Sequence, residues 1–134
     1  MKRLTVLLLL MVSTNVFAEW TMVGEVTAKG GWVAYADTQS IRKNGNKVTM
    51  WHLLDLQTFG MVGSNKYLST VIRREYDCEA ETSRLLDDYW YAGNMKTGEL
   101  INSLTNIKED HVSMIPGNLI ETLFNIACSK KLKN

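Results

Sequence analysis

The amino-acid sequence predicts an α+β fold in which a small antiparallel β-sheet of about five to six strands packs with one C-terminal α-helix, with one disulfide. Short stretches rich in aromatic and β-branched residues recur through residues 19–104, and Gly and Asn turn signals separate them, which is typical of an antiparallel meander. Near the C-terminus the apolar period changes to helical spacing. The two cysteines, Cys78 and Cys128, fall one in each part, so a bond between them would join helix to sheet.

The first 18 residues have the pattern of a secretory signal peptide. Two positive residues come first, an apolar run follows, and small residues stand three before and one before the Ala18–Glu19 bond, the expected cleavage site. The apolar run is shorter than the about 20 residues that cross a bilayer. We therefore expect residues 1–18 to be removed and residues 19–134 to form a single exported domain, periplasmic or extracellular, with no lipid anchor at the cleavage site and no transmembrane segment.

The first two expected strands are residues 19–26 and 31–41, separated by a Gly-Gly break. Asn44-Gly45-Asn46 is a strong hairpin signal, because glycine and asparagine tolerate positive φ. Residues 47–58 return across this turn as a strand. One of its faces carries Val48, Met50, His52, Leu54 and Leu56, and the other carries Thr49, Trp51, Leu53, Asp55 and Gln57. We expect the first face to be the more deeply buried, with His52 as a hydrogen-bonded core histidine rather than a catalytic base.

The middle of the chain is expected to continue the meander. Residues 58–65 contain two glycines and are predicted to form a loop. Two long strands, 66–78 and 81–93, follow, and the second of them ends in an aromatic cluster. A turn at Thr97-Gly98 and a return strand then occupy residues 94–104, which completes the expected sheet.

The helix is predicted from the stretch after Pro116, in which Leu119, Ile120, Leu123, Phe124 and Ala127 fall at helical spacing. Asn118 is expected to be the N-cap, and Glu121 three positions later completes a capping-box pattern. The apolar face of this helix should lie on the sheet. Cys128 would then pin the helix to the end of the strand that carries Cys78, and would prevent a terminal element from fraying.

Export decides how the two cysteines are interpreted. An oxidising compartment usually bridges paired thiols, and two cysteines allow only one intramolecular connectivity. A bond between Cys78 and Cys128 would close a loop of about 50 residues. In the chain-entropy account, closing this loop would stabilise the fold by roughly 4 kcal/mol. Two separate buried thiols are the alternative. A catalytic cysteine is disfavoured because neither histidine has a local motif linking it to a thiol, and two widely scattered His and two Cys are a poor metal-ligand set.

The composition excludes several classes of function. The formal net charge of the whole sequence is +1, so no global field draws the chain to nucleic acid or to an acidic membrane. The sequence contains no phosphate-cradling glycine motif, Gly-x-Ser-x-Gly elbow, zinc signature or dinucleotide fingerprint. We therefore predict no catalytic residue, no cofactor-binding residue and no metal ligand, and we expect that the protein is not an enzyme.

Six residues are candidates for contacts with a partner. Arg73 and Arg74 follow one another on an expected strand and point to opposite faces, so one of them could join Lys66 in a small basic patch for a sulfated glycan or an acidic protein segment. An edge charge that keeps strands from aggregating is the more common role of such residues. The aromatic candidates are Tyr89, Trp90 and Tyr91. Aromatic side chains are enriched at interfaces, but they also build the core of a small sheet.

Other polar residues are interpreted as structural. Asp87 and Asp88 are neighbours on one strand and face apart, so they are unsuited to paired acid–base chemistry. Arg84 is expected to be a salt-bridge partner. His111 lies in an acidic stretch and could bind a metal weakly, although its ligand count is poor.

Together these residues resemble the surface-adhesin protein E family. The resemblance covers nearly all of residues 19–134 and is carried by an ordered series, Trp20, Asp37, Trp51, Cys78, Arg84, Pro116 and Cys128, with the hairpin motif Asn-Gly-Asn-Lys-Val and the motif Ile-Pro-Gly-Asn before the helix. It implies a compact antiparallel sheet with a C-terminal helix and a Cys78–Cys128 disulfide. It also implies a bacterial surface protein that binds host matrix proteins such as vitronectin and laminin as a dimer.

Two functions follow from these observations. The first is a secreted bacterial binding protein, without enzymatic activity or cofactor, that recognises a protein or glycan partner and forms a homodimer. The second is a soluble periplasmic structural or accessory protein whose partner is another component of the cell envelope. The best-known member of the resembled family is a lipoprotein, and the absence of a lipid-bearing cysteine at the expected cleavage site favours the second function.

Overall fold

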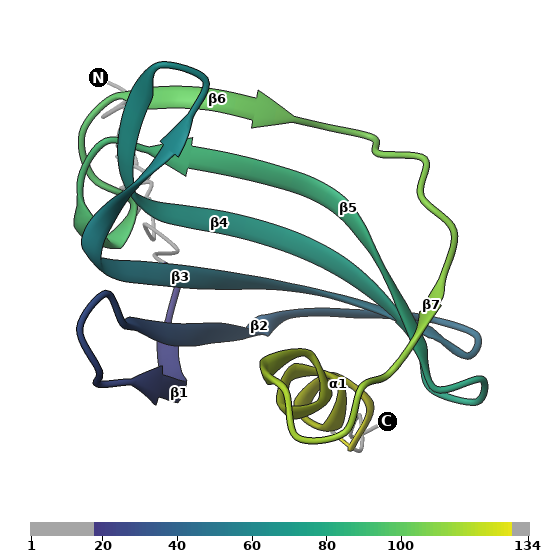
Figure 1. The fold of residues 1–134 in the computed structure, drawn as a ribbon. Coiled ribbons are helices and arrows are strands. Elements are labelled where there is room, and N and C mark those ends of the chain that lie inside the picture. Colours follow the sequence, from purple (N-terminus) through teal and green to yellow (C-terminus); the bar gives the residue numbers. More distant parts are fainter. Residues whose placement is uncertain (1–17, 130–134) are drawn as a thin grey trace, which may run out of the picture.

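The sheet is an antiparallel meander, as predicted, in which each strand pairs with the next one along the chain. In the computed structural model, which describes residues 18–129, its strands are β1 (Trp20–Val26), β2 (Trp32–Asn44), β3 (Lys47–Val62), β4 (Asn65–Asp77), β5 (Thr82–Tyr91) and β6 (Leu100–Leu104). A two-residue strand, β7 (Val112–Ser113), pairs with the start of β5, and the helix α1 spans Leu119–Ser129 (Figure 1). Residues 1–17, which hold most of the expected signal peptide, and residues 130–134 lie outside the described part.

The two long hairpins show one confirmed turn and one wrong prediction. The β2–β3 turn is at Gly45, with a φ of 61°, as the Asn-Gly-Asn signal predicts. The loop expected at residues 58–65 is mostly strand, because β3 continues to Val62 and β4 begins at Asn65. Gly60 explains the difference. It pairs with Tyr67 across the strands, and a Cβ atom at Gly60 would lie 2.5 Å from a carbon of the Tyr67 ring. This glycine gives room to an aromatic ring and does not break the strand.

The main core lies between α1 and one face of the sheet. Met50, Tyr76 and Leu123 are fully buried there, and α1 contacts β1, β2, β3 and β4. The ring of Tyr76 meets the ring of Phe124 edge to face, with 6.2 Å between the centroids. The other buried residues of this core are Ala36, Ile41, Val48 and Ala127. The helical spacing of apolar residues after Pro116 therefore predicts the correct face of the helix.

The ends of α1 are fixed by two different devices. At its start, the Asn118 side-chain oxygen accepts the backbone N–H of Glu121 (3.0 Å), which confirms the N-cap. The Glu121 carboxylate accepts the N–H of Gly117 (3.0 Å), one residue earlier than a capping box predicts. At its end, Cys128 is bonded to Cys78, which confirms the disulfide. Their Cα atoms are 5.6 Å apart, and 50 positions separate them in the sequence.

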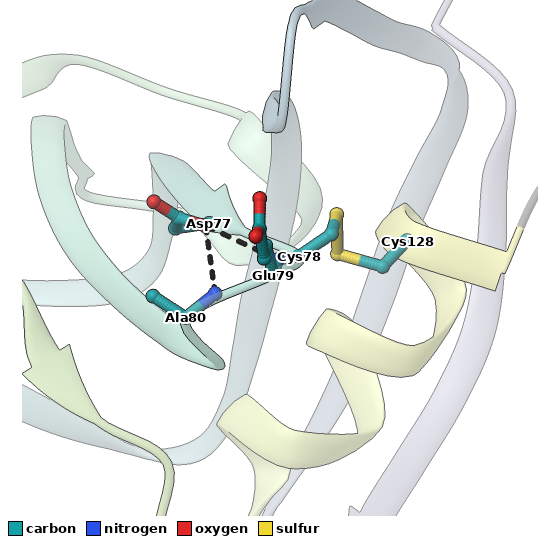
Figure 2. The surroundings of a disulfide bond; sticks show 5 residues. All are labelled: Asp77, Cys78, Glu79, Ala80 and Cys128. Carbon is teal, nitrogen blue, oxygen red and sulfur yellow. Dashed lines mark hydrogen bonds between the residues drawn. A yellow bond between two sulfur atoms is a disulfide. The ribbon is translucent and has the colours of Figure 1, made fainter.

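The sheet end of the disulfide is a rigid turn. Cys78 directly follows β4, and its N–H donates to the carbonyl of Asn46 at the tip of the neighbouring hairpin (2.9 Å). The Asp77 carboxylate accepts the backbone N–H groups of Glu79 (3.1 Å) and Ala80 (2.9 Å), as Figure 2 shows. The disulfide thus fastens the last turn of α1 to a part of the chain that is itself held by backbone hydrogen bonds.

The second face of the sheet is less exposed than the alternation predicts. Val48, Met50 and His52 are buried on the helix face, as expected, but Leu54 and Leu56, which were predicted to share that burial, are only half-buried. Leu53 on the opposite face is fully buried, with Val71 at 5% exposure. The cause is the β5–β6 connection, whose short 3-10 turn η1 (Asn94–Lys96) contacts β3 and β4. This connection forms one end of the groove described next.

Candidate ligand-binding groove

An open groove of about 300 Å³ lies on the sheet, and four of its eight lining residues are aromatic. Its lining residues, which we call the aromatic groove, are Ala18, Trp20, Asp37, Trp51, Val71, Tyr89, Tyr91 and Lys96. Because successive strand residues point to opposite faces, Trp51 lies on the face opposite Met50, which packs under α1. The strand register places Val71 opposite Tyr89 and near Trp51 on this same face. The groove volume is at the small end of the roughly 300–1,000 Å³ range of ligand sites.

The rings of the groove pack against one another. The centroids of Trp51 and Tyr89 are 6.0 Å apart, and the two rings are tilted by 43°. Arg73 is the β4 partner of Trp51, and its guanidinium carbon lies 5.6 Å from the centroid of a Trp51 ring. Both distances lie within the ranges of favourable aromatic and cation–π contacts. The Trp51 ring is therefore held in place before any ligand arrives.

Arg73 is itself fixed by a buried carboxylate. Its Nε is 2.6 Å from Oδ2 of Asp87, a residue that is only 5% exposed. The other Asp87 oxygen accepts the backbone N–H of Asn106 (3.0 Å). The charge of Arg73 is thus already paired, and its main effect on the groove is to support the Trp51 ring.

Lys96 reaches the groove from a backbone in an unusual conformation. Met95 and Lys96 are consecutive non-glycine residues with positive φ, 51° and 61°. The Asp55 carboxylate accepts the N–H of Met95 (2.7 Å), and the Ser69 hydroxyl accepts the N–H of Lys96 (2.9 Å). The same hydroxyl donates to the carbonyl of Gly93 (2.6 Å), and Ser69 is fully buried. Long-range contacts therefore hold a conformation that costs free energy for residues with a side chain.

The phenol of Tyr91 is expected to stay protonated at the groove. Burial, with a smaller contribution from the nearby Tyr89, raises the pKa of Tyr91 above its ordinary value. A protonated phenol can both donate and accept a hydrogen bond. The groove therefore offers aromatic faces, hydroxyl groups, one carboxylate from Asp37 and one ammonium from Lys96.

The six predicted partner-binding residues are distributed over different parts of the molecule. Tyr89 and Tyr91 line the groove, and Arg73 supports it. Trp90 lies between the two tyrosines on β5 and so points to the other face of the sheet. The remaining two, Arg74 and Lys66, are also away from the groove. The Lys66 ammonium lies 4.2 Å from the ring centroid of Phe59 in the β3–β4 hairpin. The structure does not bring the three cations into one patch.

Arg74 belongs to a row of buried polar groups on the helix face. It donates from Nη2 to the Ser83 hydroxyl (3.0 Å), and burial lowers the pKa of its guanidinium although Tyr76 and Glu109 oppose this. Burial, assisted by the charge of Arg74, lowers the pKa of His52 to about 3. Among the described residues, His52 Nδ1, Arg74 Nε and the Tyr76 hydroxyl have no hydrogen-bond partner. His52 is therefore buried as expected, but its Nδ1 does not have the hydrogen bond that we expected.

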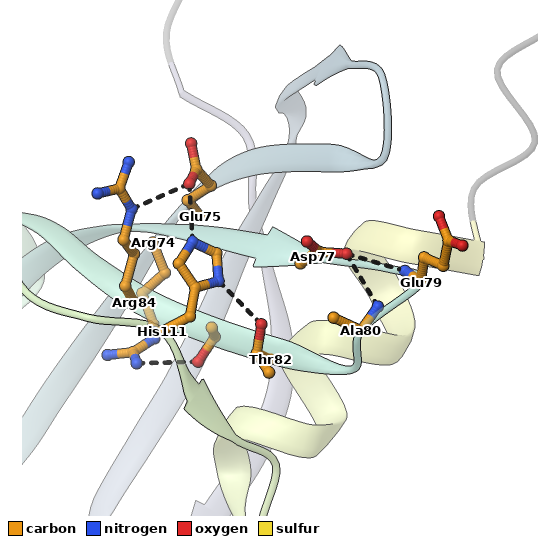
Figure 3. Close-up of polar contacts among 9 residues, drawn as sticks. Arg74, Glu75, Asp77, Glu79, Ala80, Thr82, Arg84 and His111 are labelled. Atoms are coloured by element: carbon orange, nitrogen blue, oxygen red, sulfur yellow. Dashed lines mark hydrogen bonds and ion pairs between the residues drawn. The ribbon is translucent and has the colours of Figure 1, made fainter.

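His111 and Arg84 share one carboxylate, that of Glu75 (Figure 3). Arg84 Nε lies 2.9 Å and His111 Nε2 lies 3.0 Å from the same Glu75 oxygen, while His111 Nδ1 is 2.9 Å from the Thr82 hydroxyl. Burial raises the pKa of Glu75, but the hydrogen bonds from Arg84 and His111, with the charges of Arg84 and Lys47, outweigh it and lower the pKa. Arg84 is thus the expected salt-bridge partner.

Within residues 18–129, no group of three His, Cys, Asp or Glu side chains could hold a metal.

Sequence reasoning missed four residues of the groove, because it did not single out Trp20, Asp37, Trp51 or Lys96 as binding residues. Lys96 has only a weak local signal, the turn at Thr97-Gly98 that follows it.

No helix in the described part of the chain is both long and apolar enough to cross a membrane.

Comparison with known proteins gives one family and one fold. The sequence model of the family described as surface-adhesin protein E matches residues 20–129. A solved structure of Haemophilus influenzae protein E has a TM-score of 0.61 and 15% identity, covering 81% of this chain and 83% of that chain. Crystal form II of the same protein has a TM-score of 0.60 and 16% identity, covering 72% and 80%. At these identities the structural likeness shows a shared fold. No curated protein sequence matches the chain significantly.

Proposed function

The chain belongs to the surface-adhesin protein E family, and on that basis we propose that it is an exported bacterial protein that binds a protein or glycan partner through the aromatic groove, without covalent chemistry. The observation that carries this proposal is the groove itself, which gathers four aromatic residues on the face of the sheet that α1 does not cover. Tyr and Trp side chains are the usual anchors of binding interfaces.

The rigidity of the groove supports binding. A site binds more tightly when its side chains do not lose freedom on association. Arg73 and Tyr89 hold the Trp51 ring from two sides, and the buried Ser69 hydroxyl holds the backbone beside Lys96. The ligand would therefore meet preformed surfaces.

We propose host matrix proteins such as vitronectin and laminin as partners, because the family resemblance implies them. The test is binding of the oxidised chain, residues 19–134, to each immobilised matrix protein, measured by biolayer interferometry. Tyr89→Ser and Tyr91→Ser should each weaken binding at least tenfold. Phe59→Ser, which removes an exposed aromatic ring elsewhere on β3, is the matched control and should bind like the unchanged chain. Absence of binding by correctly oxidised protein would contradict this choice of partner.

A second candidate is a periplasmic structural or accessory protein that binds another envelope component. Its support is that the two cysteines of the sequence are bonded to each other, so neither is available for a lipid thioether. Cell fractionation distinguishes the two candidates. Recovery only in osmotic-shock fluid favours the periplasmic role, whereas cleavage by protease added to intact cells favours display on the surface.

Export and self-association complete the proposal. Cleavage between Ala18 and Glu19 is tested by the intact mass of protein recovered from its native host.

We propose that a homodimer forms through β1, an edge strand that exposes Met22 (57%) and Val26 (41%). Light scattering should give the dimer mass for the unchanged chain and the monomer mass for Met22→Lys, because a charge on an edge strand opposes pairing.

A further inference from the structure

We infer that the aromatic groove binds a single sugar ring that carries a carboxylate, with the Lys96 ammonium paired to the carboxylate and the Trp51 and Tyr89 rings packed against the sugar. The inference rests on the proposed binding function and names the ligand class of the same site. It concerns one sugar unit, at the end of a glycan or within it, and not a folded protein surface.

The mixture of groups in the groove favours a sugar over an apolar ligand. A pyranose has C–H groups on its faces, which can pack on aromatic rings, and hydroxyl groups around its edge. Asp37 can accept hydrogen bonds from hydroxyl groups, and the neutral Tyr91 phenol can donate or accept. The Asp37 carboxylate accepts the backbone N–H of Gln39 (3.1 Å), and Lys96 is exposed. A wholly apolar ligand would cover both charged groups without offering either a hydrogen bond, which costs affinity.

The groove has one cation that is free to pair with a ligand carboxylate. Arg73 is already paired with Asp87 at 2.6 Å. Lys96 takes part in none of the ion pairs found among residues 18–129. Asp37, the other charged residue of the lining that has no ion pair among residues 18–129, can accept hydrogen bonds from hydroxyl groups of a ligand. The ammonium of Lys96 is the cation of the groove that can pair with a ligand carboxylate.

The backbone at Lys96 is a second, separate observation. A left-handed residue with a side chain costs on the order of 1 kcal/mol, and glycine would adopt this conformation without that cost. Here a lysine holds the position, its N–H bonded to the buried Ser69 hydroxyl and its side chain lining the groove. Such strain is typical of functional sites, where the position of a side chain matters more than stability.

The size of the groove and the presence of Asp37 argue against an acidic peptide. A volume of about 300 Å³ accepts a small ligand rather than a long segment. A run of acidic residues would also bring further carboxylates near Asp37, and like charges repel. One carboxylate among several hydroxyl groups, as in a sialic or uronic acid, matches one ammonium and one carboxylate.

The test is an NMR titration of the oxidised, ¹⁵N-labelled chain of residues 19–134. The probes are 3′-sialyllactose, a glucuronic-acid disaccharide, neutral lactose and an Asp-rich hexapeptide. We expect at least one acidic sugar to shift the Trp51 indole signal and the backbone signals of Tyr89 and Lys96. Lactose should bind at least tenfold more weakly. Equal binding of lactose and the acidic sugars, no shift with any sugar, or shifts with the peptide alone would overturn the inference.

Substitutions at Lys96 separate charge from backbone. Lys96→Gly keeps the left-handed conformation and removes the ammonium, so we expect binding to fall at least tenfold while the thermal unfolding midpoint stays the same or rises. Lys96→Arg should retain most of the binding. Lys29→Gln, which removes an exposed lysine of the β1–β2 loop, is the control and should change nothing. Unchanged binding by Lys96→Gly would overturn the inference.

The outcome is independent of the larger proposal. If no sugar binds but the chain still binds a matrix protein through Tyr89 and Tyr91, the sugar inference fails and the proposed function stands. If an acidic sugar binds through Lys96 but no matrix protein does, the choice of matrix partner fails and the inference stands.

Discussion

Arg73 and Asp87 form an ion pair in which the two partners differ in exposure. Their Nε and Oδ2 atoms are 2.6 Å apart, and the side chain of Arg73 is 36% exposed while that of Asp87 is 7% exposed. The arginine can be hydrated without its partner, but the carboxylate cannot. The pair is therefore asymmetric, and it joins the buried part of β5 to the ring of Trp51 in the groove.

This asymmetry predicts unequal effects of the two single substitutions. Arg73→Met should lower the free energy of unfolding by about 2–3 kcal/mol, because it leaves a buried charge without a partner. Asp87→Asn should cost about 1 kcal/mol, since Arg73 then turns to water. The double variant should be more stable than the sum predicts. Urea unfolding followed by tryptophan fluorescence measures all three, and equal, additive costs would contradict the account.

The disulfide predicts where the chain opens first when it is absent. With Cys78 and Cys128 both changed to Ala, we expect the free energy of unfolding to fall by roughly 3–4 kcal/mol. The backbone amides of α1 should also exchange with deuterium faster than global unfolding allows, because the last turn has lost its covalent link to the sheet and is held by packing alone. Amides of β3 and β4 in the same sample are the internal control. Equal protection of α1 and these strands would show that core packing alone holds the helix.

Much of the fold can be predicted because its signals are local. The Asn44-Gly45-Asn46 turn, the Asn118 cap and the apolar spacing of α1 each lie within a few residues of the structure that they specify. The disulfide is predicted from the oxidising compartment that export implies and from the presence of two cysteines in the sequence. These features need no knowledge of which strand lies beside which.

The groove could not be predicted because its causes are not local. The left-handed backbone at Lys96 depends on the hydroxyl of Ser69, 27 positions away. The strand role of Gly60 depends on Tyr67 across a hairpin. Register shifts interrupt the pairing between Asp37 and Arg42 and between Arg73 and Arg74, and they change which side chains meet on a face. A single sequence contains no sign of these pairings.

The contact of Gly60 with Tyr67 predicts a substitution and its rescue. Gly60→Val should lower the free energy of unfolding by about 1–3 kcal/mol, because the added atoms meet the Tyr67 ring. In a Tyr67→Ala background the same change should cost little, since the ring is gone and valine suits a strand. Thermal or urea unfolding of the four chains measures the coupling. An equal cost in both backgrounds would mean that Gly60 is needed for another reason.

His52 predicts a loss of stability in mild acid. The pKa of His52 is about 3 in the folded chain and about 6.5 when unfolded, because burial and Arg74 disfavour its charged form. Between these values the unfolded state binds more protons, so the free energy of unfolding falls as the pH falls from about 6.5 to 3. The upper limit of this effect is about 5 kcal/mol.

His52→Gln tests that prediction because glutamine does not titrate. Its free energy of unfolding should depend less on pH between 6.5 and 4 than that of the unchanged chain. Carboxylates whose pKa is lowered in the folded state, such as Glu75, lose their contribution at still lower pH in both chains. The difference between the two urea-unfolding curves therefore isolates His52. Parallel pH profiles would contradict the assignment.

The N-terminus gives a final prediction, which rests on the inferred sugar site and on cleavage after Ala18. Ala18 lines the groove, and the Glu19 carboxylate accepts a hydrogen bond from the Gln39 amide (2.8 Å), so the backbone at residue 19 is held beside the groove. Cleavage would remove Ala18 and create an α-ammonium group there, with an ordinary pKa of about 7.7–8.0. The cleaved chain should therefore bind an acidic sugar severalfold more tightly than the uncleaved chain, and should lose this gain above pH 8. Acetylation of the Glu19 amino group is the control, because it removes the charge but not the opening of the groove. If the acetylated and free chains bind equally, the α-ammonium has no part in recognition.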